Sequence, residues 1–140
     1  MTTIQSTRRP GQGSRTRLMW LLYLCDAGLL VTSGLIHLHL WDVAYRHVKT
    51  LDVLFLIQVA LSVLAAAALL VTRHLLIVLG AAALMAGTII GFLLARTVGL
   101  FGFRLTFSSG LAYTVLVVEA SAVVLLVLTG WLQRKQHGGR

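Results

Sequence analysis

Residues 53–95, VLFLIQVALSVLAAAALLVTRHLLIVLGAAALMAGTIIGFLLA, contain one charged side chain, that of Arg73. The apolar runs on either side of the Thr-Arg-His break are close to the roughly 20 residues with which a helix crosses the hydrocarbon core of a bilayer. Transmembrane strands need alternating polar positions, whereas these runs are apolar all round. The stretch therefore predicts two transmembrane helices joined by a tight turn.

The same apolar pattern recurs before and after this stretch. Of the 140 residues, 58% are hydrophobic and 11% are charged, which lies outside the range of ordinary soluble domains. Four spans are predicted, at 18–40, 53–71, 75–95 and 111–132. Because short connections force neighbouring helices to be antiparallel, the predicted fold is an all-α integral membrane four-helix bundle with up-down-up-down topology.

Both ends of the sequence are polar. Residues 1–16 are rich in Thr, Ser, Gln, Gly and Arg, a composition that favours a disordered basic tail. Residues 17–133 form one predicted membrane domain, and residues 134–140 form a second short tail. The first apolar run is too long for a cleaved signal peptide, so we expect it to be retained as a span.

The basic residues indicate how the spans are oriented. Eight of the twelve Lys and Arg residues lie before span one, between spans two and three, or after span four. Because short loops rich in Lys and Arg stay in the cytoplasm, both termini are predicted to be cytoplasmic. This topology, together with contact with anionic lipids of the bilayer, accounts for the net charge of +8, so the charge does not indicate nucleic-acid binding.

Two connections between the spans have patterns of their own. In WDVAYRHVKTL, residues 41–51, apolar side chains recur at helical spacing, which predicts a short helix lying in the outer membrane interface. Residues 101–108 alternate Phe or Leu with smaller or polar side chains, which predicts an extended segment. Anchoring by aromatic side chains at the interface explains both patterns without a ligand.

Span three carries a row of small residues. Ala83, Gly87 and Gly91 are spaced four apart and lie on one helix face. Small side chains let a second helix approach closely. We expect this face to serve helix packing, either against another span of the same chain or against a second copy in a homodimer.

The two acids within the spans are the strongest indication of a functional site. Asp26 and Glu119 each lie about eight residues from the end of their span, at a depth of about 12 Å for a rise of 1.5 Å per residue. A charge at this depth is costly, and no Lys or Arg reaches a comparable depth in the predicted spans. We therefore expect both carboxyl groups to be neutral.

Helical periodicity relates these acids to other polar residues of the spans. Asp26 shares one face of span one with Ser33 and His37, and Gln58 shares a face of span two with Ser62. If these faces converge with Glu119, they form a polar column between His37 and Asp26. Such a column is suited to carrying protons, to binding a polar head group, or to holding the bundle together. The predicted polar-cavity residues are Asp26, Ser33, His37, Gln58, Ser62 and Glu119.

Metal binding is a second hypothesis for the histidines. His37 and His39 are two residues apart, so on a helix they point about 160° away from each other and do not bind one ion unless the helix has ended there. Haem held by two histidines has no evident second ligand in the chain. Copper, zinc or haem bound by His37 or His39 together with His47 is the alternative to the rim of a polar cavity.

The segments SGLIHLHLWDVAYRHVKTLDVLFLIQ at 33–58 and TVGLFGFR at 97–104, with Glu119 in the fourth span, resemble small four-span membrane proteins common in actinobacteria. The resemblance covers most of residues 30–120. It implies a bacterial cytoplasmic membrane location and brings no activity, cofactor or catalytic residue with it. Four spans with an intramembrane acid also resemble the small multidrug resistance transporters, which have an essential Glu in the first span where this sequence has Asp26.

Two classes of function follow from these features. The first is a non-enzymatic accessory protein that binds a lipid, a quinone or a larger membrane complex. The second is a proton-coupled small transporter, or a redox protein linked to haem or metal, that uses Asp26, Glu119 and His37. The sequence has no nucleophile-elbow, phosphate-loop, CxxC or HExxH motif, so it gives no support to hydrolysis or nucleotide chemistry. We favour the accessory class.

Overall fold

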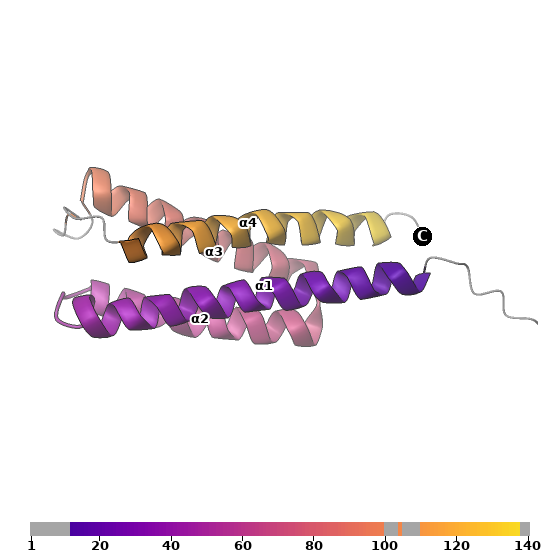
Figure 1. Ribbon diagram of the computed structural model, residues 1–140, viewed down its shortest axis with the longest axis horizontal. Helices are drawn as coiled ribbons and strands as arrows, with labels where there is room; N and C mark the ends of the chain where they lie inside the picture. Colours follow the sequence, from indigo (N-terminus) through magenta and orange to yellow (C-terminus); the bar gives the residue numbers. More distant parts are fainter. Residues whose placement is uncertain (1–11, 100–103, 105–109, 138–140) are drawn as a thin grey trace, which may run out of the picture.

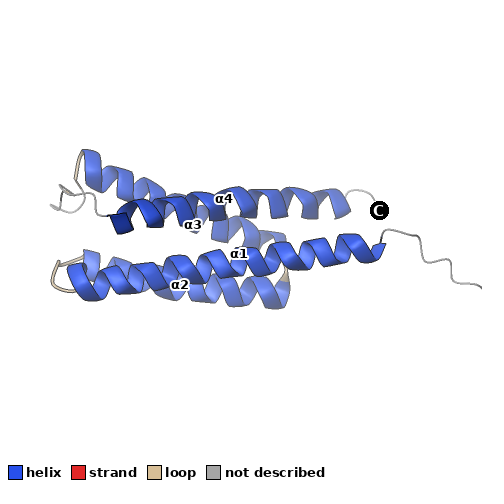
Figure 2. Cartoon of the chain, viewed as in Figure 1, coloured by secondary structure: helices blue, strands red, loops and turns tan. Residues whose placement is uncertain are grey.

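A computed structural model of the chain describes residues 12–99, 104 and 110–137. Four long helices and one short π-helical turn make up this part, and no strand occurs within it. Figure 2 shows the four long helices side by side, with short loops in the described connections from α1 to α2 and from α2 to α3. In order, the elements are α1 (Gln12–Leu40), η1 (Trp41–Tyr45), α2 (Leu51–Thr72), α3 (Leu75–Thr97) and α4 (Gly110–His137).

All four long helices are long and apolar enough to cross a membrane. A helix bonds its backbone N–H and C=O groups within itself, which is the requirement that a bilayer imposes on a spanning segment. Large apolar side chains such as Leu64, Val71, Leu76 and Val124 stay exposed on the bundle surface. In a bilayer this surface contacts lipid tails, so the chain has the character of a multi-pass membrane protein.

The helices extend beyond the predicted spans, by the most residues at the start of α1 and at the end of α4. α1 begins at Gln12, so residues 12–16 are helical although they were assigned to the tail, and α4 continues to His137. Adding residues to an existing helix costs little because each one gains a hydrogen bond. The remaining predicted tail residues, 1–11 and 138–140, lie outside the described part of the chain.

The connection after α1 differs from the separate short helix that was predicted. The helix continues from Leu40 into η1, whose end is marked by the N–H of Arg46 donating to the Trp41 carbonyl at 2.8 Å. No Gly or Pro stands between Gly34 and Thr50 to stop the helix earlier. The chain turns at Thr50, which has a φ of 74°, and α2 begins at the next residue. Of the predicted extended segment at 101–108, the structure describes Arg104 alone.

The bundle has two ends, which we name by what they contain. The terminal end holds the start of α1, the Arg73–His74 turn and the end of α4, and the η1 end lies opposite (Figure 1). At the terminal end, Gln133 of α4 donates to the Arg73 carbonyl at 2.7 Å, and the His74 ring accepts from the N–H of Leu76 at 3.3 Å. The first bond holds the turn between α2 and α3 against α4, and the second caps the start of α3.

The helices pack closely at some contacts and loosely at others. α1 contacts α2 and α4 extensively, α3 contacts α4, and α2 contacts α3 less than any of these pairs. Between α1 and α2, a Cβ on Gly34 would lie 3.3 Å from the Ser62 Cβ. In Figure 1, α2 and α3 diverge from the turn that joins them toward the η1 end.

Candidate functional site

The α1–α4 contact contains two buried pairs, each of one acid and one hydroxyl. Thr129 of α4 donates to Asp26 Oδ2 of α1 at 2.7 Å, and Ser33 of α1 lies with its Oγ 3.4 Å from Glu119 Oε1 of α4. Both acids are buried, at 0% and 1% exposure. Each carboxyl group thus comes from one helix and receives its hydroxyl partner from the other.

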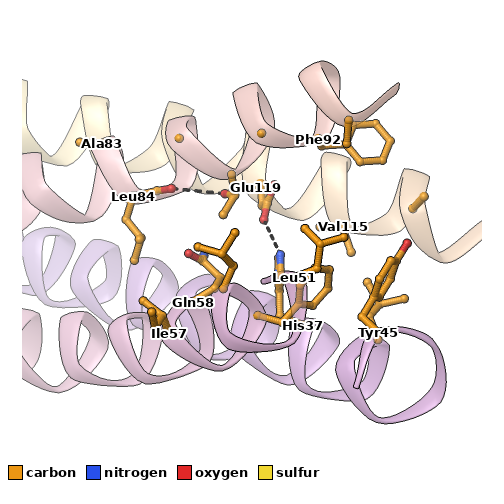
Figure 3. Close-up of a pocket in the computed structure, with 18 residues that line it drawn as sticks. His37, Tyr45, Leu51, Ile57, Gln58, Ala83, Leu84, Phe92, Val115 and Glu119 are labelled. Carbon is orange, nitrogen blue, oxygen red and sulfur yellow. Dashed lines mark hydrogen bonds and ion pairs between the residues drawn. The ribbon is translucent and has the colours of Figure 1, made fainter. Parts of the chain in front are cut away.

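His37 completes the second pair and has a defined tautomer. Its Nδ1 lies 2.9 Å from the Ser33 carbonyl oxygen, which only accepts, so Nδ1 carries a hydrogen. In the neutral ring this leaves Nε2 as an acceptor, and it lies 3.6 Å from Glu119 Oε1 (Figure 3). One proton shared by this pair can therefore be held by the carboxyl group or by the imidazole.

Aromatic rings support His37 from the side of α2. The ring of Phe55 lies 5.3 Å from the His37 ring, and Tyr45 of η1 stacks on Phe55 at 4.6 Å between centroids. The π-helical turn brings Tyr45 over α2, so η1 contributes directly to the surroundings of His37. These contacts hold the imidazole in one orientation.

A cavity of about 470 Å³ opens beside His37 and Glu119. Its size falls in the range of roughly 300–1,000 Å³ typical of small-molecule sites. The wall is mostly apolar, with few polar groups, and none of the described residues that line it is Lys or Arg. Figure 3 shows Gln58, Ile57, Leu84 and Phe92 around the same space.

The small-residue face of α3 forms part of this wall. Ala83, Gly87 and Gly91 all line the cavity, and a Cβ built on Gly87 or Gly91 would meet no atom within 4 Å. The predicted close approach of another span of the same chain is therefore absent at these two glycines. At these positions the face borders the cavity instead of a neighbouring helix.

The six predicted polar-cavity residues do not all line the cavity. His37, Gln58 and Glu119 line the cavity, whereas Asp26, Ser33 and Ser62 are buried without lining it. The Gln58 amide lies 3.4 Å from the Ser62 hydroxyl, so these two form a separate pair within α2.

The predicted column from His37 to Asp26 is interrupted. Leu30 of α1 and Ala122 and Leu126 of α4 are fully buried, and they stand in sequence between the two acid–hydroxyl pairs. The described residues thus form two polar clusters separated by an apolar layer. The helical periodicity that places Asp26 and His37 on one face of α1 also places Leu30 there, four residues after Asp26.

The histidines proposed as metal ligands differ in their exposure. His37 is buried, whereas His39 and His47 are exposed. Within the described part of the chain, no three His, Cys, Asp or Glu side chains form a group that could hold a metal ion.

Thr129, Tyr45 and Phe55 were not anticipated from the sequence. A signal for Thr129 was present, because the buried positions of α4 at Glu119, Ala122, Leu126 and Thr129 follow alternating steps of three and four residues. Such steps mark one helix seam. Nothing in the sequence indicated that Tyr45 and Phe55 would stack.

Comparisons with protein-family models, with curated proteins and with solved structures found no match.

Proposed function

We propose that this protein is an integral protein of the bacterial cytoplasmic membrane with up-down-up-down topology and both termini in the cytoplasm. The terminal end carries basic side chains beside aromatic rings, with Arg73 3.6 Å from the Trp20 ring and Lys135 3.7 Å from the Trp131 ring. Trp with Lys or Arg is typical of a cytoplasmic membrane interface. On the same proposal, residues 41–50 lie at the outer interface.

Single-cysteine labelling tests this topology. The native Cys25 is replaced by Ser, and one Cys is introduced at Ser14, Lys49 or Gln136 in turn. An impermeant reagent applied to intact cells should label the position at 49 and spare the two terminal positions. Labelling of either terminal position without cell lysis would overturn the orientation.

We propose further that the protein binds, without catalysing a reaction, an uncharged lipophilic molecule drawn from the bilayer, either a lipid or a quinone. The observation that supports this is an apolar cavity of about 470 Å³ with His37 and Glu119 in its wall. The apolar wall favours a hydrophobic tail, and the His37–Glu119 pair offers the few polar contacts that orient such ligands. This is the chemistry expected of an accessory component of a membrane complex.

Retention of a bound lipophile tests the binding function. The protein is purified in a mild detergent and extracted with organic solvent, and the extracted lipophiles are quantified by mass spectrometry. Gly87→Leu should fill the cavity and reduce the retained molecule. The matched control is Gly80→Leu, on the same helix, because Gly80 does not line the cavity and a Cβ there meets no atom within 4 Å. Equal retention by the two variants would contradict binding in this cavity.

A further inference from the structure

We infer that the cavity takes a ligand of the quinone class, a flat uncharged ring bearing two oxygens and an apolar tail. The ring oxygens would meet the His37–Glu119 pair, and the tail would lie along the small-residue face of α3. This inference rests on the proposed binding function and narrows its ligand.

Charge in the cavity wall argues against an anionic head group. Glu119 is the one acid among the described lining residues, and no Lys or Arg lines the cavity to balance a second negative charge. A phosphate or carboxylate head would therefore stand beside a buried carboxyl group without a counter-ion. Burying an unpaired charge in this way is strongly unfavourable. The polar end of the ligand must be uncharged or cationic.

Hydrogen bonding then favours a head group that works as acceptor and as donor. Since Nδ1 of His37 is committed to the Ser33 carbonyl, the shared proton of the pair resides at Nε2 or on Glu119, beside the cavity. In one state the pair donates to a quinone oxygen, and in the other it accepts from a hydroquinone O–H. A permanently cationic head group has no oxygen that could accept a hydrogen bond from the pair when the pair is the donor.

The shape and chemistry of the wall fit a flat ring with a tail. His37, Phe55 and Tyr45 present a continuous group of rings at the η1 end of the cavity. Rings pack favourably in offset or tilted arrangements. Beyond them, Gly87, Gly91 and other apolar residues make up most of the wall, in which Gln58 and Thr88 are the further hydrogen-bonding side chains.

Binding of a short-tailed benzoquinone to lipid-depleted protein in detergent tests the inference. Decyl-benzoquinone and its reduced form should both bind at saturation with one molecule per chain, measured by isothermal titration calorimetry. Decanoate and a decyl trimethylammonium salt, which have the same tail length, should compete poorly. Glu119→Gln should weaken quinone binding about tenfold, since an amide cannot exchange a proton with His37 and leaves the pair in one hydrogen-bonding state.

The matched control is Asp26→Asn, which alters the other buried acid and lies away from the cavity. It should bind the quinone as tightly as the native chain does. If Glu119→Gln fails to fold, His37→Gln replaces it with the same expected weakening. Quinone binding equal in the native chain, the cavity variant and Asp26→Asn would overturn the inference.

Two other outcomes separate the ligand class from the function. Preferred binding of the ammonium salt or of decanoate at the same site, abolished by Gly87→Leu, would reject the quinone class and the uncharged head group, and would leave standing only that the cavity binds a lipophilic molecule. Failure of Gly87→Leu to change the binding of any of these molecules would reject the binding function as well.

Discussion

The two halves of the α1–α4 contact differ although they are built from the same chemical pair. Toward the terminal end, Asp26 receives one hydrogen bond from Thr129, and its Oδ1 has no partner among the described residues. Toward the η1 end, Glu119 has Ser33 and His37 beside it and faces a cavity. One acid is enclosed by packed side chains, and the other lies in the wall of an open space.

The surrounding helices cause this difference. At the terminal end, Gly130 of α4 lies so near α3 that an added Cβ would be 3.5 Å from both Leu75 and Val78. Nearer the η1 end, Gly87 and Gly91 meet no such neighbours. A buried carboxyl group in a membrane helix is therefore a structural element or a binding group according to the room that neighbouring helices leave around it.

The largest effect on the free energy of unfolding is expected from substitutions at glycines that are packed differently in the two halves of the bundle. Gly130→Leu should lower the free energy of unfolding by about 1–3 kcal/mol relative to Gly87→Leu, because it overpacks the closed half. The gain in helix propensity is the same for both changes, so it cancels. Unfolding in a series of sodium dodecyl sulfate concentrations, followed by circular dichroism, measures the difference. Equal stabilities would show that the two halves are equally open.

Removing either of the two hydroxyl partners of the acids should have a smaller effect on the free energy of unfolding. Thr129→Val should cost about 1 kcal/mol, because both oxygens of Asp26 would then lack a donor. Ser33→Ala should cost less, since His37 remains beside Glu119 and the cavity is adjacent. The same unfolding assay applies. A loss at Ser33 as large as that at Thr129 would mean that Glu119 is as tightly enclosed as Asp26.

The histidines near the η1 end should respond unequally. His37→Ala removes the bond to the Ser33 carbonyl, at a cost of about 0.6 kcal/mol, and should reduce the retained lipophile. His39→Ala changes an exposed side chain and should alter neither quantity. Lipophile retention and visible absorbance of the purified variants are the measurements. Equal losses at His39 and His47, with a chromophore that disappears in each, would favour a shared metal or haem site.

The smallest effect concerns charged side chains at the two ends. Arg73→Gln removes a guanidinium 3.6 Å from the Trp20 ring and should cost about 0.5 kcal/mol. Arg46→Gln removes an exposed pair with Asp42 at 3.3 Å, and such pairs contribute little. The unfolding assay should therefore separate the two variants by a few tenths of a kcal/mol. A larger loss of stability in Arg46→Gln than in Arg73→Gln would indicate that the Arg46–Asp42 ion pair stabilises the η1 end.

Much of the fold could be predicted from the sequence, because each membrane-spanning helix is specified by the residues of its own segment. A segment such as 53–71 has to satisfy its backbone within itself and face lipid with its side chains, so composition and length suffice to identify it as a helix. The predicted starts and ends of α2 and α3 accordingly lie within two residues of those in the structure. Periodicity also places Ser33 and His37 on one face of α1, and both are buried.

Composition and length are enough to predict the four apolar helices and the two acids within them. Tertiary structure alone decided that Asp26 pairs with Thr129, that Glu119 lies beside His37, and that α2 and α3 part to leave a cavity. These outcomes depend on how side chains of different helices fit together. Apolar spans surrounded by lipid carry little sequence signal about which of their faces meet, because lipid tails are as apolar as the partner helix.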